Sequence, residues 1–89
     1  MKTTLDELQA FVAVVAAGSI TAGSEQLELT VSATSRALAR LEEKLQTTLL
    51  RRTTRRLELT EEGAVFLERA QAILASVDDA EEQLAARRT

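Results

Sequence analysis

The last third of the chain constrains the fold most, because it predicts one long helix with a continuous apolar stripe. Apolar residues recur there at alternating spacings of four and three positions: Phe66, Ala70, Ile73, Val77, Ala80 and Leu84. This spacing is typical of the seam between two paired helices. At ~1.5 Å per residue, a helix from Thr60 to about residue 87 is about 40 Å long and outruns any core that the preceding residues can build. We therefore assign the stripe to homodimerisation, with the part near Phe66 and Leu67 also packing within one chain.

Capping signals predict three shorter helices in the first half of the chain. Thr4 and Glu7 have the spacing of a capping box, and Gly18 is suited to end the helix that they start. Ser19 and Thr30 are N-cap residues for the two helices that follow. The helices expected from these signals span about 5–17, 20–27 and 31–45.

The second and third predicted helices, joined by a short turn at Glu28 and Leu29, match a helix-turn-helix. The third helix has a buried face made of Thr34, Leu38, Leu41 and Leu45. Its opposite face carries Ser32, Ser35, Arg36, Ala39 and Arg40. A helix that enters the major groove of DNA needs small side chains near its N-terminus and a few hydrogen-bond donors. The alternative is an ordinary amphipathic helix in a bundle.

Four arginines lie within six residues after this helix, at positions 51, 52, 55 and 56. The flanking segments 49–52 and 56–59 read as two short strands of a hairpin. Arginine suits bidentate phosphate contacts and insertion into a narrow minor groove. We therefore expect the hairpin to touch DNA; the alternative is a solvated charged turn.

The charges are unevenly distributed along the chain. The net charge is −3, yet residues 36–56 hold seven basic and two acidic residues, and residues 57–89 hold eight acidic and three basic residues. The Debye length is about 8 Å at physiological salt, so the two regions act almost independently. A basic end of this kind can attract a phosphate backbone although the whole chain is acidic.

The composition gives little support to catalysis. The chain has no His and no Cys, which excludes disulfides, thiolate nucleophiles and thiolate zinc sites. Its adjacent carboxylates diverge by about 100° on a helix and cannot share a proton. We therefore expect no enzyme activity, no cofactor and no metal. The chain shows no secretory leader and no apolar stretch near ~18 residues, so we expect a cytoplasmic protein without membrane contact.

Three runs of this sequence together resemble the N-terminal DNA-binding domain of the LysR-type transcriptional regulators of bacteria. They are FVAVVAAGSI at 11–20, TVSATSRALARLE at 30–42 and RRTTRRLELTEEG at 51–63. The resemblance covers about residues 4–87 and implies a mainly α fold. That fold is a winged helix-turn-helix, with a three-helix core and a short β-hairpin wing, followed by a long linker helix. It further implies antiparallel pairing of the linker helices in a homodimer that binds an inverted-repeat operator in double-stranded DNA.

The resemblance also implies which residues contact DNA. The base-reading positions of the family fall on Val31, Ser32 and Ser35, with Thr30 and Arg36 nearby. The wing contacts fall on Arg52, Thr53, Arg55 and Arg56. Together with Arg40 from the exposed helix face, these residues form the candidate DNA-binding set.

The chain departs from the family pattern at several points. Val31 stands where many members have Gln or Pro, Gly23 and Ser24 replace two alanines, and Gln46 replaces the glycine that ends the recognition helix. Residues 1–59 correspond to the winged helix-turn-helix and residues 60–89 to the linker helix. The C-terminal effector-binding domain, which would hold the effector ligand, has no counterpart here, so we expect a fragment. The alternative function is a winged-helix protein-interaction module that does not bind DNA.

Overall fold

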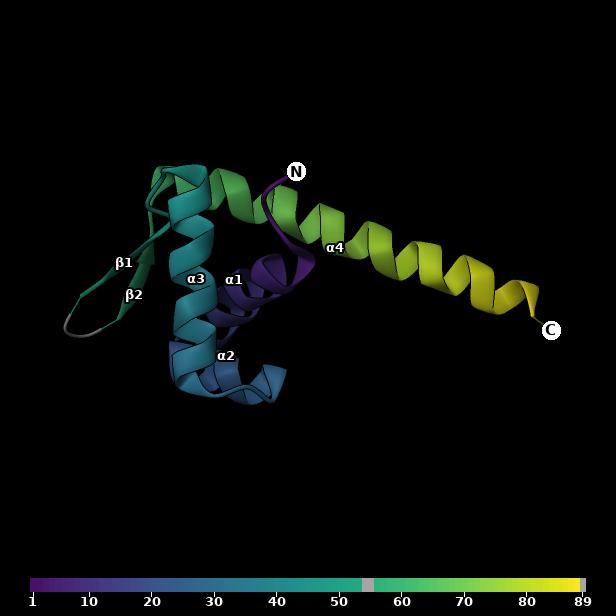
Figure 1. Ribbon diagram of the computed structural model, residues 1–89, viewed down its shortest axis with the longest axis horizontal. Coiled ribbons are helices and arrows are strands. Elements are labelled where there is room, and N and C mark those ends of the chain that lie inside the picture. The colour runs from purple at the N-terminus through teal and green to yellow at the C-terminus, as the bar shows by residue number, and fades with distance from the viewer. Residues whose placement is uncertain (54–55, 89) are drawn as a thin grey trace.

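Four helices and one two-stranded antiparallel hairpin make up the described part of the chain (Figure 1). The computed structural model describes residues 1–53 and 56–88. In chain order the elements are α1 (Leu5–Ala17), α2 (Ile20–Leu27), α3 (Val31–Leu45), β1 (Leu50–Arg52), β2 (Leu57–Leu59) and α4 (Glu61–Arg87). The first three helices form a bundle, the hairpin projects beside α3, and α4 extends away from the bundle (Figure 1). The predicted fold, a winged helix-turn-helix followed by a long helix, is confirmed.

The helix boundaries follow from local hydrogen bonds that the sequence predicts. At the start of α1, the Glu7 N–H donates to Thr4 Oγ1 at 3.2 Å, and the Thr4 N–H donates to Glu7 Oε1 at 3.0 Å. Gly18 ends α1 with φ of 84°, a left-handed conformation that favours glycine. The hydroxyls of Ser19, Thr30 and Thr60 cap α2, α3 and α4, because each accepts from the backbone N–H three residues later. None of the helices in the described residues is long and apolar enough to cross a membrane.

The core lies where α1 crosses the other helices. Phe11, Val14 and Leu41 are fully buried there, and the ring of Phe11 packs on that of Phe66 with centroids 5.7 Å apart. A Cβ atom on Gly23 would come within 2.8 Å of Val14. The small residues predicted in α2 therefore allow α1 and α2 to approach closely.

The apolar stripe of α4 divides into a part inside the core and a part outside it. The assignment of Ala70 to a dimer seam is wrong, because this residue is 0% exposed within its own chain. Phe66 is half-buried against α1, whereas Ile73 is 45% and Leu84 is 65% exposed. The second half of α4 extends clear of the bundle (Figure 1). The exposed part of the stripe therefore begins near Ile73.

Gln46 ends α3 in the left-handed conformation, with φ of 52° and ψ of 42°. A residue with a Cβ is strained there, by roughly 1–2 kcal/mol. We expect Gln46→Gly to raise the free energy of unfolding by about 0.5–1 kcal/mol in urea titrations, because glycine removes this strain but gains freedom in the unfolded chain. Gln71→Gly, in the exposed middle of α4, is the control and should lower it by a similar amount. Equal destabilisation by both changes would contradict the strain.

Candidate nucleic-acid interface

The first two turns of α3 present the predicted base-reading residues on an exposed surface. Thr30, Val31, Ser32 and Arg36 are exposed, and Ser35 is half-buried. The Thr30 hydroxyl accepts from the Ala33 N–H at 3.0 Å, so it is occupied as an N-cap. The side chains at this end are short, and the positive end of the helix dipole lies there. A base edge or a phosphate can therefore approach the backbone of α3 closely.

One side chain of the hairpin reaches this same end of α3. Arg52 Nη2 donates to Ser35 Oγ at 3.2 Å, which joins two residues that are 17 positions apart. The register of the hairpin pairs Arg52 with Leu57 and Arg51 with Glu58. The structure thus joins the predicted recognition helix to the end of β1 that leads into the tip of the predicted wing.

Glu42 fixes the base of the hairpin to the other end of α3. Its Oε2 accepts from the backbone N–H groups of Leu49 at 2.7 Å and Leu50 at 3.1 Å. On the opposite side, the Thr60 hydroxyl donates to the Thr48 carbonyl at 2.7 Å. These bonds hold the hairpin at a fixed angle to α3, a role of Glu42 that the sequence pattern does not reveal.

Three of the predicted wing residues have different surroundings. The Thr53 hydroxyl accepts from the Arg56 N–H at 3.0 Å and donates to the Arg56 carbonyl at 2.9 Å, so it shapes the hairpin tip. The Arg56 guanidinium lies 3.2 Å from a carboxylate oxygen of Glu58, and both side chains are largely exposed to water. Such a pair contributes little to stability and can open to meet a phosphate. The third residue, Arg55, lies outside the described residues.

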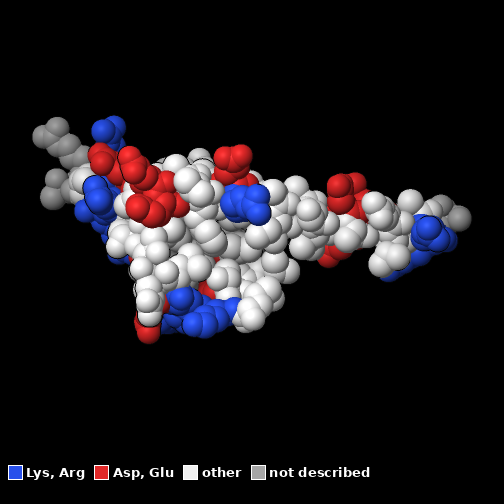
Figure 2. All heavy atoms as spheres, turned by 90° about the horizontal axis from the view of Figure 1, so that it is seen from above, with Lys and Arg blue, Asp and Glu red and all other residues white. Residues whose placement is uncertain are grey.

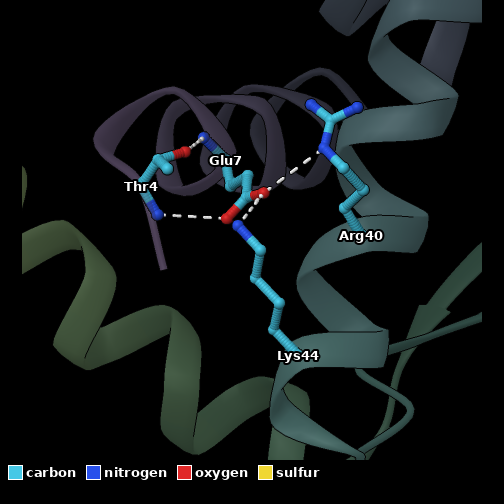
Figure 3. Close-up of polar contacts among 4 residues, drawn as sticks. All are labelled: Thr4, Glu7, Arg40 and Lys44. Carbon is cyan, nitrogen blue, oxygen red and sulfur yellow. Dashed lines mark hydrogen bonds and ion pairs between the residues drawn. The ribbon is translucent and has the colours of Figure 1, made fainter. Parts of the chain in front are cut away.

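Among the described residues of the candidate DNA-binding set, Arg40 lies on a different face of α3 from Ser35. It lies five positions after Ser35, about 140° further around the helix axis. Its Nε is 3.5 Å from Glu7 Oε2, and the same oxygen accepts from Lys44 Nζ at 2.7 Å (Figure 3). Arg40 therefore flanks the recognition surface on the side of α1, opposite to the wing.

Glu7 is a buried residue, only 1% exposed, and its carboxylate ties the start of α1 to α3 (Figure 3). Burial by itself raises the pKa of this carboxyl. Hydrogen bonds from Lys44 and the Thr4 N–H, with the charge of Lys44 and the contact with Arg40, outweigh burial and hold the pKa below its ordinary value. The capping pattern predicts the bond to Thr4 but not the second oxygen's contact with α3.

A lowered pKa in the folded state makes this part of the stability depend on pH. The contribution of Glu7 is complete above the unfolded pKa of a glutamate, ~4.3, and is lost as the pH falls through the lower folded-state value. We expect Glu7→Gln to lower the free energy of unfolding at pH 7 by about 1–2 kcal/mol, because Lys44 and Arg40 remain partly hydrated. The variant should also lose less stability below about pH 4.3.

Urea titrations between pH 3 and 7 measure both effects, at roughly one-unit steps across the window set by the glutamate pKa. Glu68→Gln, on the exposed surface of α4, is the matched control for removal of one carboxylate. If the free energy of unfolding of Glu7→Gln falls with acid as steeply as that of the unsubstituted chain, Glu7 does not carry this dependence on pH.

The first and last turns of α4 carry opposite charges. Figure 2 shows acidic groups gathered over the start of this helix and basic groups at its far end. Glu61 and Glu62 occupy the first turn, and Arg87 lies in the last turn and is followed by Arg88. An apolar groove of about 490 Å³ lies beside the first turns of α4, at its acidic end. It is lined by Leu45, Thr47, Leu49, Val65, Phe66 and Arg69, with Glu61 and Glu62 at its rim.

Comparison with known proteins identifies the family. The model of the bacterial regulatory helix-turn-helix proteins of the lysR family matches residues 5–64. The transcriptional regulator CrgA of Neisseria meningitidis is 52% identical over 86 residues, which are 97% of this chain and 29% of CrgA. This chain thus spans less than a third of that curated relative.

Two solved structures share the fold over nearly their whole length. The complex of the BenM DBD with catB site 1 DNA superposes with a TM-score of 0.92 at 32% identity and covers 97% of both chains. The complex of the CbnR DBD with DNA gives 0.87 at 31% identity, covering 97% of this chain and 99% of that one. With a family model that matches most of its length and these structural likenesses, the chain belongs to the LysR family of bacterial regulatory helix-turn-helix proteins.

Proposed function

We propose that this chain is the sequence-specific DNA-binding domain of a bacterial transcriptional regulator. Residues 1–59 are the unit that contacts DNA, and residues 60–89 are the segment that joins two copies through α4. The N-terminal half of α3 enters the major groove, and the hairpin follows the flanking minor groove and backbone. The observation that carries this proposal is the contact of Arg52 with Ser35, which places the wing beside the exposed end of the recognition helix.

Charge and similarity support DNA as the ligand. The exposed residues Arg36 and Arg52 lie beside Ser35, and the hairpin adds the exposed Arg56; arginine binds phosphate through paired donors. The BenM and CbnR domains, which superpose on nearly the whole chain, are in complexes with DNA. Val31 is 48% exposed and offers an apolar contact of the kind that a thymine methyl accepts.

We further propose that two copies pair through antiparallel α4 helices. Ile73 and Leu84 are exposed apolar residues on the outer part of the stripe. Antiparallel pairing brings the basic end of one α4 to the acidic rim of the groove in the other, and it places Leu84 of the partner subunit over that groove. A twofold axis repeats the DNA-binding surface in inverted orientation, which matches an inverted-repeat operator.

Fluorescence anisotropy tests DNA binding directly. The chain is titrated into a random duplex and into a duplex selected from a random pool, at two salt concentrations. We expect tighter binding to the selected duplex and weaker binding to both duplexes at the higher salt, because phosphate contacts release counterions. Absence of salt-dependent binding to either duplex would overturn the proposal in favour of a protein-interaction module.

The wing makes a separate prediction. Arg55→Ala combined with Arg56→Ala should weaken binding to all duplexes and make the plot of log affinity against log salt shallower by about 0.9 for each phosphate that the variant no longer neutralises. Lys2→Ala, which removes a positive charge at the N-terminus, serves as the control and should leave the slope unchanged. A double variant with the slope of the unsubstituted chain would refute the phosphate contacts of the wing.

A further inference from the structure

Ser35 is the residue where the recognition helix meets the wing, and its bond to Arg52 restricts what its hydroxyl can do. The guanidinium group carries only donors, so Ser35 Oγ is the acceptor in the 3.2 Å bond. A hydroxyl has one hydrogen to donate and two lone pairs to accept with. The bond to Arg52 uses one lone pair and leaves the hydrogen for another partner.

Two other hydroxyls, one in α2 and one in α3, donate their hydrogen to the backbone one turn earlier. Ser24 donates to the Ile20 carbonyl at 2.7 Å, and Thr34 donates to the Thr30 carbonyl at 3.0 Å. The hydrogen bonds of residues 1–53 and 56–88 include no such bond from Ser35 to the Val31 carbonyl. Ser35 is also only half-buried. Its hydrogen is therefore available on the surface that faces DNA.

We propose that Ser35 acts on DNA as a hydrogen-bond donor and that Arg52 is the positioning residue that sets this direction. The inference rests on the proposed function and adds a base preference to it. A cationic donor on Oγ polarises the O–H bond, which strengthens donation, and its charge disfavours the approach of a second donor. Arg52 thus contributes to sequence choice through Ser35 as well as to affinity through its charge.

The donor role of Ser35 predicts to which bases it can form a hydrogen bond. In the major groove guanine presents N7 and O6, adenine presents N7 and thymine presents O4 as acceptors, whereas cytosine presents its N4 amino donor. Ser35 therefore discriminates against cytosine on the strand that it contacts. A phosphate oxygen is also an acceptor, but a contact there carries no base preference.

The unsubstituted 89-residue chain is first used to select duplexes from a random pool. The variants are then compared on these duplexes. The position read by Ser35 is the one whose preference Ser35→Ala relaxes. Duplexes with a purine, a 7-deazapurine and a cytosine at that position then measure discrimination for each variant. The control for Arg52→Gln is Arg51→Gln, which removes the same charge from the neighbouring residue of β1. The control for Ser35→Ala is Ser32→Ala, which removes a serine from the same face of α3. Thermal unfolding monitored by circular dichroism confirms that each variant folds.

We expect Ser35→Ala to reduce the discrimination against cytosine by about fivefold to tenfold, as for removal of one hydrogen bond. Arg52→Gln should reduce the same discrimination, and the double variant should lose no more than either single variant. Arg51→Gln should weaken binding to all duplexes equally, and Ser32→Ala should leave the preference at this position unchanged. Where the preferred base is adenine, whose acceptor in the major groove is N7, the 7-deazapurine should weaken binding of the unsubstituted chain but not of Ser35→Ala.

Two results would overturn the inference while leaving DNA binding intact. One is an Arg52→Gln variant that keeps the full discrimination against cytosine at this position, because Ser35 would then act as a donor without Arg52. The other is a Ser35→Ala variant that loses affinity equally for all bases, because its contact would then be to phosphate. Absence of salt-dependent binding in the unsubstituted chain is a different result, and it would remove the proposed function itself.

Discussion

Gly63→Ala will lower the free energy of unfolding by about 2–4 kcal/mol, although the same exchange at an ordinary helix position raises it by roughly 0.5–1 kcal/mol. Gly63 is buried in the first turn of α4, and a Cβ atom there would overlap the carbonyl oxygen of Leu49. That carbonyl accepts from the Thr60 N–H at 3.0 Å. Moving it strains the bonds that join the hairpin to α4.

Urea unfolding followed by circular dichroism measures this destabilisation. Ala64→Gly, at the exposed neighbouring position, is the matched control and should cost only about 0.5–1 kcal/mol, the ordinary helix penalty of glycine. A Gly63→Ala variant that is more stable than the unsubstituted chain would show that α4 can move away from β1 without cost.

The second large effect concerns the pairing of α4. Ile73→Asp combined with Leu84→Asp places two carboxylates on the exposed part of the apolar stripe. We expect the homodimer to dissociate and the affinity for an inverted-repeat duplex to fall by about 10²–10⁴-fold, because each half-site then binds a single recognition helix without the effective concentration of the linked copy. Sedimentation equilibrium measures the assembly state, and anisotropy measures the affinity.

The control for this variant keeps the added charge and changes the face. Gln71→Asp combined with Ala75→Asp places two carboxylates on exposed positions away from the stripe. This control should remain dimeric and lose little affinity. A stripe variant that still sediments as a dimer would contradict pairing through α4, and a monomer with unchanged affinity would contradict the inverted repeat.

Local signals predicted the elements well because the interactions that start and end a helix lie within a few residues. Thr4, Ser19, Thr30 and Thr60 each cap the helix that follows, as their sequence context predicts. The uneven charge distribution likewise indicates a basic end in an acidic chain. The spacing of the apolar stripe correctly predicted one long helix, but its assignment of Ala70 to a dimer seam is wrong. Spacing does not tell whether an apolar face packs on its own chain or on a partner.

The sequence by itself thus determined the order and bounds of the helices, the Arg-rich hairpin and the family. Only the tertiary structure decided which charged and polar groups meet. Glu7 meets Lys44 across 37 positions, Arg52 meets Ser35 across 17, and Arg40 lies on the far side of α3 from the wing. Such contacts depend on the angles at which helices pack, and those angles are set by buried side chains throughout the core. Four arginines in six residues therefore predict a surface that binds phosphate, but the role of Arg52 in base choice follows only from its place beside Ser35.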